Sequence, residues 1–348
     1  MGKLRAITAA VIGLAPLAFV VTVVAGPVAV AGATPSCTSA GKTGLTAAVV
    51  ASPGQRIDGG TVDATGCDVG IYVGPGMEHV VIDGVTVTGA NDHGIFVQDT
   101  SQVTIENSTI SGNGIDPTTG IAENKGVELV GTTNSVVRDN TVTGNLADGG
   151  IGIADDGPID PGAPDPGTLL ASTNNVVSGN TVSGNYVGCG IVLAAYNAGA
   201  GIFNNVVVGN TVTGTVGFTL HGPVVGGIVV AADTPGTTVS NNTVVHNTDT
   251  NSFIPGIVVH SNSPGDVVSN NSIVANTLNG DGWGKIDGPP EMVGILVGAG
   301  TKASLTNTTV AANRITNEDY GVYVNSATAT HVGGLPLDRA ATPVVGLP

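Results

Sequence analysis

The side chains best suited to chemistry stand beside a glycine that recurs along the chain. Near four successive copies of this glycine lie Asp68, Asp92, His93, Asn124, Lys125, Glu128 and Asp148. Glycosidases use two carboxyl groups held roughly 5 to 9.5 Å apart as acid and base or nucleophile. A carboxyl group crowded by a like charge keeps its proton to higher pH and becomes a general acid.

These residues suggest a glycosidase in which Asp92 and Asp148 are the acid and base. The further catalytic and substrate-binding groups of this hypothesis are Glu128, His93, Asp68 and Lys125. A simpler interpretation competes with it. Asp and Asn favour turns because their side chains hydrogen-bond the local backbone, so the acidic residues before the glycine are also explained by structure alone.

A second group of carboxylates lies in a Pro- and Gly-rich stretch, and includes Asp155, Asp156 and Asp160. Calcium takes oxygen ligands in flexible geometry, so this stretch suggests a calcium site. The stretch does not follow the EF-hand pattern, and a solvated acidic loop is the alternative. The six histidines are scattered without metal-ligand spacing. Calcium is therefore the one cofactor that the sequence suggests.

A repeated element must position these side chains. A unit of Gly, Ile or Val, any residue and an aliphatic residue recurs nine times, beginning at Gly70, Gly94, Gly126, Gly150, Gly190, Gly227, Gly256, Gly294 and Gly321. Most copies are followed by two further β-rich stretches with a tight polar turn between them, as in residues 136–145. Strands this short cannot bury a face in one hairpin, so we expect them to stack coil on coil into three parallel sheets.

Composition favours the same structure. The chain has 54 glycines and only 3% aromatic residues, and its mean hydropathy is +0.31. Val and Thr are abundant, and strong helix formers are scarce, so strand is the regular structure that we expect. Insertions of varied length precede or follow the Gly-Ile strand, while the polar turn stays short.

Asparagines mark that turn. Our alignment of the repeats places at one position Asn140, Asn180, Asn210, Asn242 and Asn271. Asn tolerates the left-handed backbone of a tight turn. Stacked about 4.8 Å apart, the amides can hydrogen-bond from coil to coil as a ladder. We interpret this column as structural.

The repeats resemble the pectate-lyase-like superfamily over roughly residues 57–325. The resemblance implies an all-β fold, a single-stranded right-handed parallel β-helix of about nine coils. The superfamily includes polysaccharide lyases, glycoside hydrolases, epimerases, tailspikes and proteins without known activity. Fold alone therefore does not choose the function.

In enzymes of this superfamily the substrate usually lies along the first sheet. The outward positions of the Gly-Ile strands are mostly apolar or small here, from Tyr72 and Phe96 to Val258, Leu296 and Tyr323. A polyuronate lyase needs basic residues, and the chain has only 10 Lys and Arg. The Gly-His-Gly and Arg-Ile-Lys motifs of polygalacturonases are absent. If the protein is an enzyme, a glycoside hydrolase is favoured over a polyuronate lyase.

The first 33 residues are typical of a secretory signal peptide, with a basic start, an apolar run and A-x-A sites ending at Ala33. A retained transmembrane anchor is the alternative. After cleavage no stable membrane anchor remains, so we expect a secreted or cell-surface protein. Cys37 and Cys67 are expected to form a disulfide. The net charge of −16 argues against a nucleic acid partner.

The expected organisation is a signal peptide (1–33), an N-terminal cap (34–56), the β-helix (57–325) and a C-terminal tail (326–348), which either drapes over the last coil or is disordered. Two functions follow. The protein binds or hydrolyses an extracellular polysaccharide, with a glycan as its partner. Alternatively, it is a non-catalytic structural or adhesion protein that contacts a surface protein through the apolar outward column from Val192 to Leu296.

Overall fold

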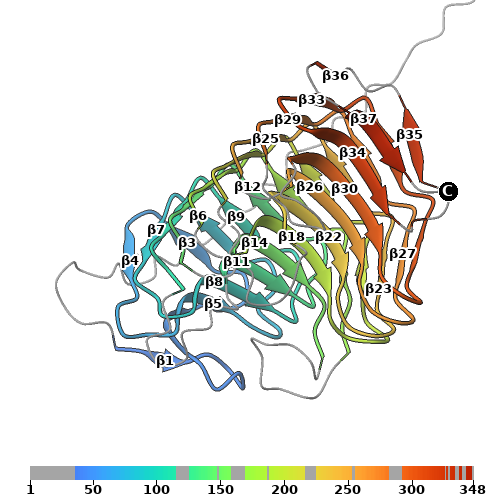
Figure 1. Ribbon diagram of the computed structural model, residues 1–348. Coiled ribbons are helices and arrows are strands. Elements are labelled where there is room, and N and C mark those ends of the chain that lie inside the picture. Colours follow the sequence, from blue (N-terminus) through green and yellow to red (C-terminus); the bar gives the residue numbers. More distant parts are fainter. Residues whose placement is uncertain are drawn as a thin grey trace, which may run out of the picture.

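The structure is a computed structural model that describes residues 36–114, 125–146, 149–157, 169–185, 188–215, 225–252, 255–281 and 292–325, with short pieces after residue 326. All regular structure in this part of the chain is β-strand. Among the described residues, no helix is long and apolar enough to cross a membrane. Figure 1 shows the strands stacked in chain order from one end of the molecule to the other.

The first sheet contains the nine Gly-Ile repeats as consecutive strands, and it extends further at both ends. All its pairs are parallel except β1 with β2. In sheet order its strands are β1 (Thr38–Ser39), β2 (Thr46–Val50), β5 (Val69–Val73), β8 (His93–Gln98), β11 (Lys125–Val130), β14 (Gly149–Ala154), β18 (Cys189–Ala195), β22 (Ile228–Ala232), β26 (Ile257–Ser261), β30 (Val293–Ala299), β34 (Tyr320–Asn325) and β37 (Thr342–Gly346).

The second and third sheets are also parallel and are built from three-residue strands, except for the two-residue β36. The second sheet consists of β3 (Arg56–Asp58), β6 (Val81–Asp83), β9 (Thr104–Glu106), β12 (Val136–Arg138), β16 (Val176–Ser178), β20 (Val206–Val208), β24 (Thr243–Val245), β28 (Ser272–Val274), β32 (Thr309–Ala311) and β35 (His331–Gly333). The third consists of β4 (Thr61–Asp63), β7 (Thr86–Thr88), β10 (Thr109–Ser111), β13 (Thr141–Thr143), β17 (Thr181–Ser183), β21 (Thr211–Thr213), β25 (Thr248–Thr250), β29 (Thr277–Asn279), β33 (Arg314–Thr316) and β36 (Leu337–Asp338).

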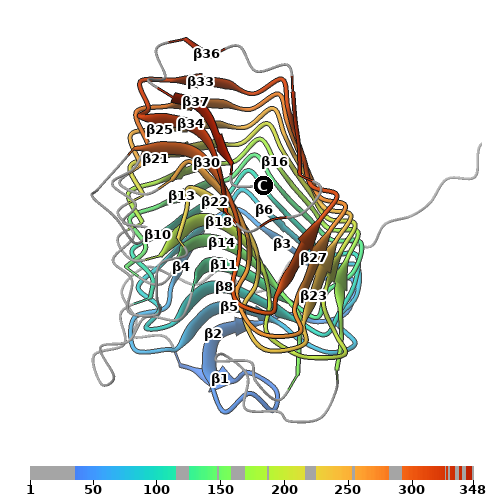
Figure 2. The same cartoon turned by 45° about the vertical axis from the view of Figure 1, so that its right-hand side comes forward.

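A fourth sheet, which the sequence did not predict, joins the first sheet to the second in the later coils. Its strands are β15 (Ser172–Thr173), β19 (Ile202–Phe203), β23 (Thr238–Ser240), β27 (Val267–Ser269) and β31 (Ser304–Thr306). Each coil thus runs from the first sheet through this corner to the second and third sheets and back. Figure 2 shows the coils surrounding a common interior.

The repeat glycine is required by lack of space. A Cβ on Gly94 would lie 2.5 Å from Cγ2 of Ile110 and 2.6 Å from the carbonyl oxygen of Gly126 in the next coil. Such contacts are shorter than real Cβ atoms make. The chain therefore turns from the third sheet into the first only where no side chain is present.

The interior is filled by columns of stacked aliphatic side chains. Ile71, Ile95, Val127 and Ile151 follow one another in the first sheet, and all are buried. Alternate residues of each strand point inward, which explains why the repeat has an aliphatic residue at every second position. The core is therefore continuous along the whole stack.

Asparagine ladders occupy the corners, as expected, but in more than one column. In the corner between the second and third sheets, each side-chain oxygen accepts from the backbone N–H of the preceding coil. The asparagine amides also donate to the next oxygen at 2.9–3.0 Å. The members of this ladder are Ser108, Asn140, Asn180, Asn210, Asn247, Asn276 and Asn313. The prediction is confirmed for the three asparagines Asn140, Asn180 and Asn210.

It is wrong for Asn242 and Asn271. These two belong to a second ladder, which lies one corner earlier in the coil and consists of Ser135, Asn175, Asn205, Asn242 and Asn271. The misalignment arises because the asparagines recur every five residues. Each unit of a three-residue strand and a two-residue corner resembles the unit that follows it. Sliding the alignment by five residues therefore leaves the pattern nearly unchanged.

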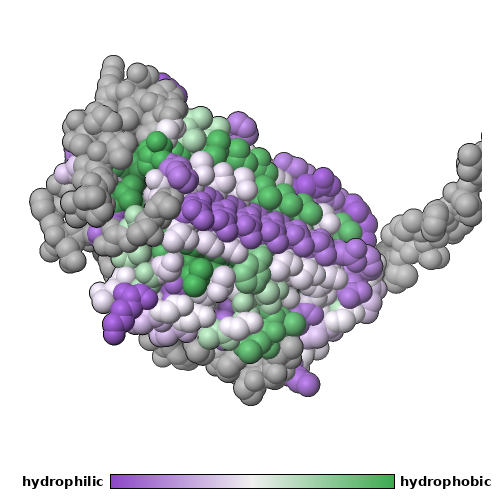
Figure 3. Space-filling view, turned by 90° about the vertical axis from the view of Figure 1, so that its right-hand side faces the viewer, coloured by the Kyte–Doolittle hydropathy of each residue, from purple (hydrophilic) through white to green (hydrophobic). Residues whose placement is uncertain are grey.

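In each corner, the residue with the left-handed backbone conformation is not the ladder asparagine, although we expected it to be. It is the residue before it, such as Asp139 (φ 57°) before Asn140 and Gly179 (φ 64°) before Asn180. In the corner before the second sheet, exposed asparagines hold this conformation in successive coils: Asn134, Asn174, Asn204, Asn241, Asn270 and Asn307. The side of the molecule on which β23 and β27 lie shows an unbroken row of hydrophilic side chains (Figure 3).

A third polar column follows the strands of the third sheet and changes character along the stack. It begins as an asparagine ladder, in which Asn113 and Asn145 bond to the next oxygen. In the last coils it consists of carboxyl groups, since the Ser252 N–H donates to Asp281 and the Asp281 N–H donates to Glu318. Asp249 lies beside them and replaces the aliphatic residue of β25. All three carboxyl groups are buried.

Candidate functional site

The first sheet brings the predicted ionisable residues to one face. Phe96 pairs with Glu128, and Glu128 pairs with Gly152, as the outward column of the repeats predicts. His93 lies at the start of β8 opposite Val69, and Lys125 lies at the start of β11 opposite Gly149. The side chains of His93, Lys125 and Glu128 therefore meet on the outside of the β-helix.

There they form a connected charged group. Nε2 of His93 lies 2.5 Å from Oε2 of Glu128, and Nζ of Lys125 donates to Oε1 of Glu128 at 3.1 Å. On the other side of the imidazole, Nδ1 of His93 lies 3.7 Å from Oδ1 of Asp92. We call Asp92, His93, Lys125 and Glu128 the charged cluster. Two carboxylates thus flank one imidazole ring.

The charged cluster is nearly closed to solvent. His93 is fully buried and stacks on Phe96, with ring centroids 4.5 Å apart. Lys125 and Glu128 are also buried, whereas the Asp92 side chain is 14% exposed. Asp92 is therefore the most exposed side chain of this group.

Mutual pairing keeps the group ionised despite its burial. Burial alone would raise the pKa of Glu128, but the charges and hydrogen bonds of Lys125 and His93 lower it to about 2. Burial alone would lower the pKa of His93, but Asp92 and Glu128 raise it. Glu128 is thus a carboxylate near neutral pH, and the two neighbouring carboxyl groups favour the imidazolium form of His93.

These protonation states limit the chemistry. Glu128 cannot donate a proton near neutral pH, and both its oxygens are occupied by cations. His93 has Glu128 at one ring nitrogen and Asp92 near the other, so it is suited to orienting Asp92. Asp92 has one oxygen toward the ring and is the more exposed of the two carboxyl groups.

The other predicted members are placed differently. Asp68 uses Oδ2 to accept from both the backbone N–H and the hydroxyl of Thr46, each at 2.7 Å, and so fastens β2 to the stack. Asp148 lies outside the described residues. The structure thus brings together Asp92, His93, Lys125 and Glu128, and it gives Asp68 an anchoring role.

The predicted calcium ligands are occupied by the protein itself. Asp155 accepts from the N–H groups of Tyr196 (2.7 Å) and Asn197 (3.1 Å), and burial raises its pKa to about 6. Asp156 accepts from Gly157 at 2.7 Å and from Gln98 at 3.4 Å. Asp160 lies outside the described residues, and the described part of the chain contains no group of three possible metal ligands. Asp155 and Asp156 therefore hold the chain after β14.

Sequence reasoning missed a polar chain beside the charged cluster. The Tyr72 hydroxyl donates to Gln98 at 3.2 Å, and the Gln98 amide donates to Asp156 at 3.4 Å. All three side chains are buried on the outward face of the first sheet. The sequence feature that could have revealed this chain is the position of Gln98, which lies two residues after the outward Phe96 and therefore also points outward.

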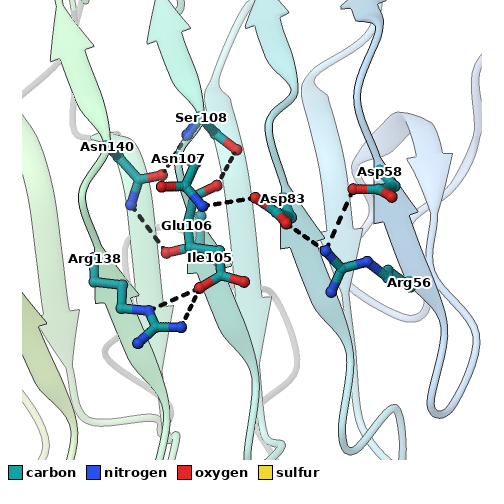
Figure 4. A network of polar contacts seen from close by, with 9 residues as sticks. All are labelled: Arg56, Asp58, Asp83, Ile105, Glu106, Asn107, Ser108, Arg138 and Asn140. Carbon is teal, nitrogen blue, oxygen red and sulfur yellow. Dashed lines mark hydrogen bonds and ion pairs between the residues drawn. The ribbon is translucent and has the colours of Figure 1, made fainter.

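It also missed a charged row on the second sheet. Asp58, Asp83, Glu106 and Arg138 stand in register on four neighbouring strands. Arg56 bridges Asp58 and Asp83, Asn107 donates to Asp83 at 2.8 Å, and Arg138 pairs with Glu106 (Figure 4). Each charged residue directly follows an inward aliphatic residue, as in Ile57-Asp58, and that repetition was the signal.

The apolar outward column is not an exposed contact surface. Val192, Val229, Val258 and Leu296 are buried and form a second hydrophobic cluster with Val293. The expectation that this column contacts a partner protein is therefore wrong, because its apolar area is already removed from water within the chain.

Known proteins share this architecture. No curated protein sequence matches the chain. The surface adhesin PfbA of Streptococcus pneumoniae has a similar structure, with a TM-score of 0.55, 11% identity, and 86% of this chain and 84% of that one covered. A tailspike protein of E. coli bacteriophage HK620 in complex with a pentasaccharide gives a TM-score of 0.52 at 15% identity, and 80% of this chain covers 54% of that one.

The sequence profile described as "Right handed beta helix region" matches residues 48–243, which is more than half of the chain. The parallel sheets, the stacked coils and the solved structures agree with it. The protein therefore belongs to the family of right-handed parallel β-helix proteins.

Proposed function

We propose that the protein binds an extracellular polysaccharide over the N-terminal part of the first sheet and hydrolyses it there. The observation that carries this proposal is the charged cluster. It occupies an outward face that is otherwise mostly apolar. Burying ionised groups is costly even when they are paired. Strongly perturbed ionisable groups gather at functional sites more often than elsewhere.

Each member has a distinct role in this proposal. Glu128 favours the protonated form of His93 and accepts its ring N–H, and Lys125 fixes Glu128 in that position. His93 positions Asp92, and Asp92 contacts the substrate as one of the two carboxyl groups of a glycosidase. Asp148 is proposed as the second, because it occupies the same position before the repeat glycine two coils further along.

The comparisons and the disulfide support the setting. One structure with this fold is described as a surface adhesin, and another holds a pentasaccharide. Cys37 and Cys67 are joined by a disulfide, and disulfides persist mainly outside the reducing cytosol. We propose that residues 1–33 are a signal peptide and that the mature protein is secreted or held at the cell surface.

The test is glycan binding and reducing-sugar release by the mature protein across a polysaccharide panel. We expect the wild type to release sugar from one polysaccharide and the Asp92→Asn variant to lose this activity. Asp139→Asn is the matched control, since it removes an exposed carboxylate from a left-handed turn that Asn tolerates. Equal sugar release by the wild type and an Asp92→Asn/Asp148→Asn variant would refute hydrolysis at this site.

The second candidate is a glycan-binding adhesion protein without catalysis. It is favoured by the near-complete burial of the charged cluster and by the full occupation of the Glu128 oxygens. This alternative predicts retention of a polysaccharide with no sugar released by any preparation. The same two assays therefore separate the two functions.

A further inference from the structure

The outward face of the third sheet is built almost wholly of threonine. Alternate residues of each strand point outward, and the first outward position is threonine in eight consecutive coils. These residues, in register, are Thr61, Thr86, Thr109, Thr141, Thr181, Thr211, Thr248 and Thr277. The second outward position holds Thr88, Ser111, Thr143, Ser183, Thr213, Thr250 and Asn279. We call these two columns the threonine face.

Strand preference alone does not explain this repetition. The second sheet has strands of the same length in the same coils, so it is an internal comparison. Its first outward positions vary among Arg56, Val81, Thr104, Val136, Val176, Val206, Thr243 and Ser272. Valine, arginine, serine and threonine all occur there, whereas the third sheet has threonine in all eight of these coils.

The hydroxyl groups of the first column are available to an external partner. Within the described chain, none of these eight hydroxyls hydrogen-bonds another protein group, and each side chain is exposed or half-buried. The second column is braced from coil to coil, with Thr143 bonded to Ser183 at 2.9 Å and Thr213 to Thr250 at 3.2 Å. These hydrogen bonds between coils fix the side-chain rotamers in the second column.

Among the described residues, the middle of the face is uncharged. The chain has 26 acidic residues, yet from β7 to β29 no outward position of this sheet is charged or aromatic. Along the border toward the first sheet, five successive coils have a glycine with positive φ: Gly89, Gly112, Gly144, Gly184 and Gly214. These five glycines contribute no side chain to the border of the face.

The geometry is that of a two-dimensional lattice. Neighbouring strands place equivalent hydroxyls about 4.8 Å apart, and the two columns are about 6.6 Å apart because they are two residues apart on a strand. Water bound to these hydroxyls takes on the same lattice, and the threonine methyl groups limit its other positions. The spacing along the stack is close to a repeat distance between oxygen atoms on the prism faces of ice.

We propose that the threonine face binds ice. A glycan would find no aromatic ring to stack on and no charged group to accept its hydroxyls. Phosphate or nucleic acid would find no basic residue. A regular, neutral array of hydroxyl and methyl groups fits a partner that is itself a lattice of water, because the bound water joins the crystal instead of being stripped from the protein.

The test compares the wild type with a Thr181→Tyr/Thr211→Tyr variant, which places bulk in the middle of the face. We expect the wild type to partition into growing ice, to inhibit ice recrystallisation and to separate freezing from melting temperature. The variant should lose most of each effect. Val206→Tyr, at the corresponding outward position of the second sheet, is the matched control and should retain all three.

A Thr181→Val/Thr211→Val variant, which keeps shape and methyl groups, tests the hydroxyls and should also weaken ice binding. Circular dichroism and the thermal midpoint must show that each variant is folded. The proposal is overturned if the folded wild type is excluded from ice like an ordinary acidic protein. It is equally overturned if the two tyrosine variants lose the effect to the same extent.

Discussion

His93 lies between two carboxylates, and its neighbours decide what each can do. Glu128 is paired on both oxygens, whereas Asp92 has contact with solvent. Two carboxyl groups that look alike in sequence therefore have different roles. The sequence placed all four members of the charged cluster near one another, because stacking brings equivalent positions together. It did not show the pairing, since that depends on side-chain directions that spacing does not define.

The buried pair of Lys125 and Glu128 gives the first prediction. Lys125→Met should destabilise the protein by about 3 to 5 kcal/mol, because it leaves buried charge without its partner. A Lys125→Met/Glu128→Met variant should recover much of this loss, since it removes both charges. Chemical denaturation measures both. Arg138→Met is the control: its partner Glu106 is on the second sheet and Arg138 is half exposed, so only a small loss is expected. Equal losses for Lys125→Met and Arg138→Met would contradict this assignment.

The corners of the coil show which part of the fold the sequence could predict. Gly-Ile repeats defined the first sheet because a glycine without space for a Cβ marks one point in each coil. The asparagine ladders were predicted, but their register was only partly right. Asn242 and Asn271 are five residues from Asn247 and Asn276, so two alignments fit the same letters. The hydrogen bonds between coils, which the letters do not contain, choose between them.

Asn180→Leu gives the second prediction. The Asn180 amide donates to the carbonyl of Val137 and to Asn210, and its oxygen accepts the N–H of Asn140. Leucine would leave buried polar groups in two coils unpaired, at about 1 to 3 kcal/mol for each group. The denaturation midpoint should fall well below that of Ser178→Leu, an outward substitution in the same coil. If the two variants unfold alike, the ladder does not stabilise the stack.

Across the whole stack, ionisable groups are distributed unevenly. The early coils have the charged cluster and the charged row on outward faces of the first and second sheets. The late coils have three carboxyl groups in the interior, where the early coils have asparagines. Oδ2 of Asp249 and Oε2 of Glu318 have no hydrogen-bond partner among the described residues. An ionised carboxylate cannot donate as an asparagine amide does, so protonation supplies the missing donor.

This arrangement predicts that stability falls as pH rises. Burial raises the pKa of Asp281 to about 7 and that of Glu318 to about 8, and burial with the charge of Asp281 raises the pKa of Asp249. The folded state therefore holds protons that the unfolded state has already released above about pH 4, so stability is lost between that pH and about 8. Asp155 acts in the same direction, and His260, with a pKa lowered by burial to about 4, acts in the opposite one.

Thermal unfolding from pH 4 to 9 measures the effect. The wild-type midpoint should decline steadily over this range, and an Asp281→Asn/Glu318→Gln variant should show a flatter profile, because its amides keep donors at every pH. Asp266→Asn is the control: Asp266 is also buried, but Thr237 and Ser263 already satisfy its oxygens, so this variant should keep the wild-type slope. If the double variant declines as steeply as the wild type, the carboxyl groups of the last coils do not govern the response. The early coils would then be its source, because the imidazolium of His93 also loses its proton, and its ion pairs, as pH rises.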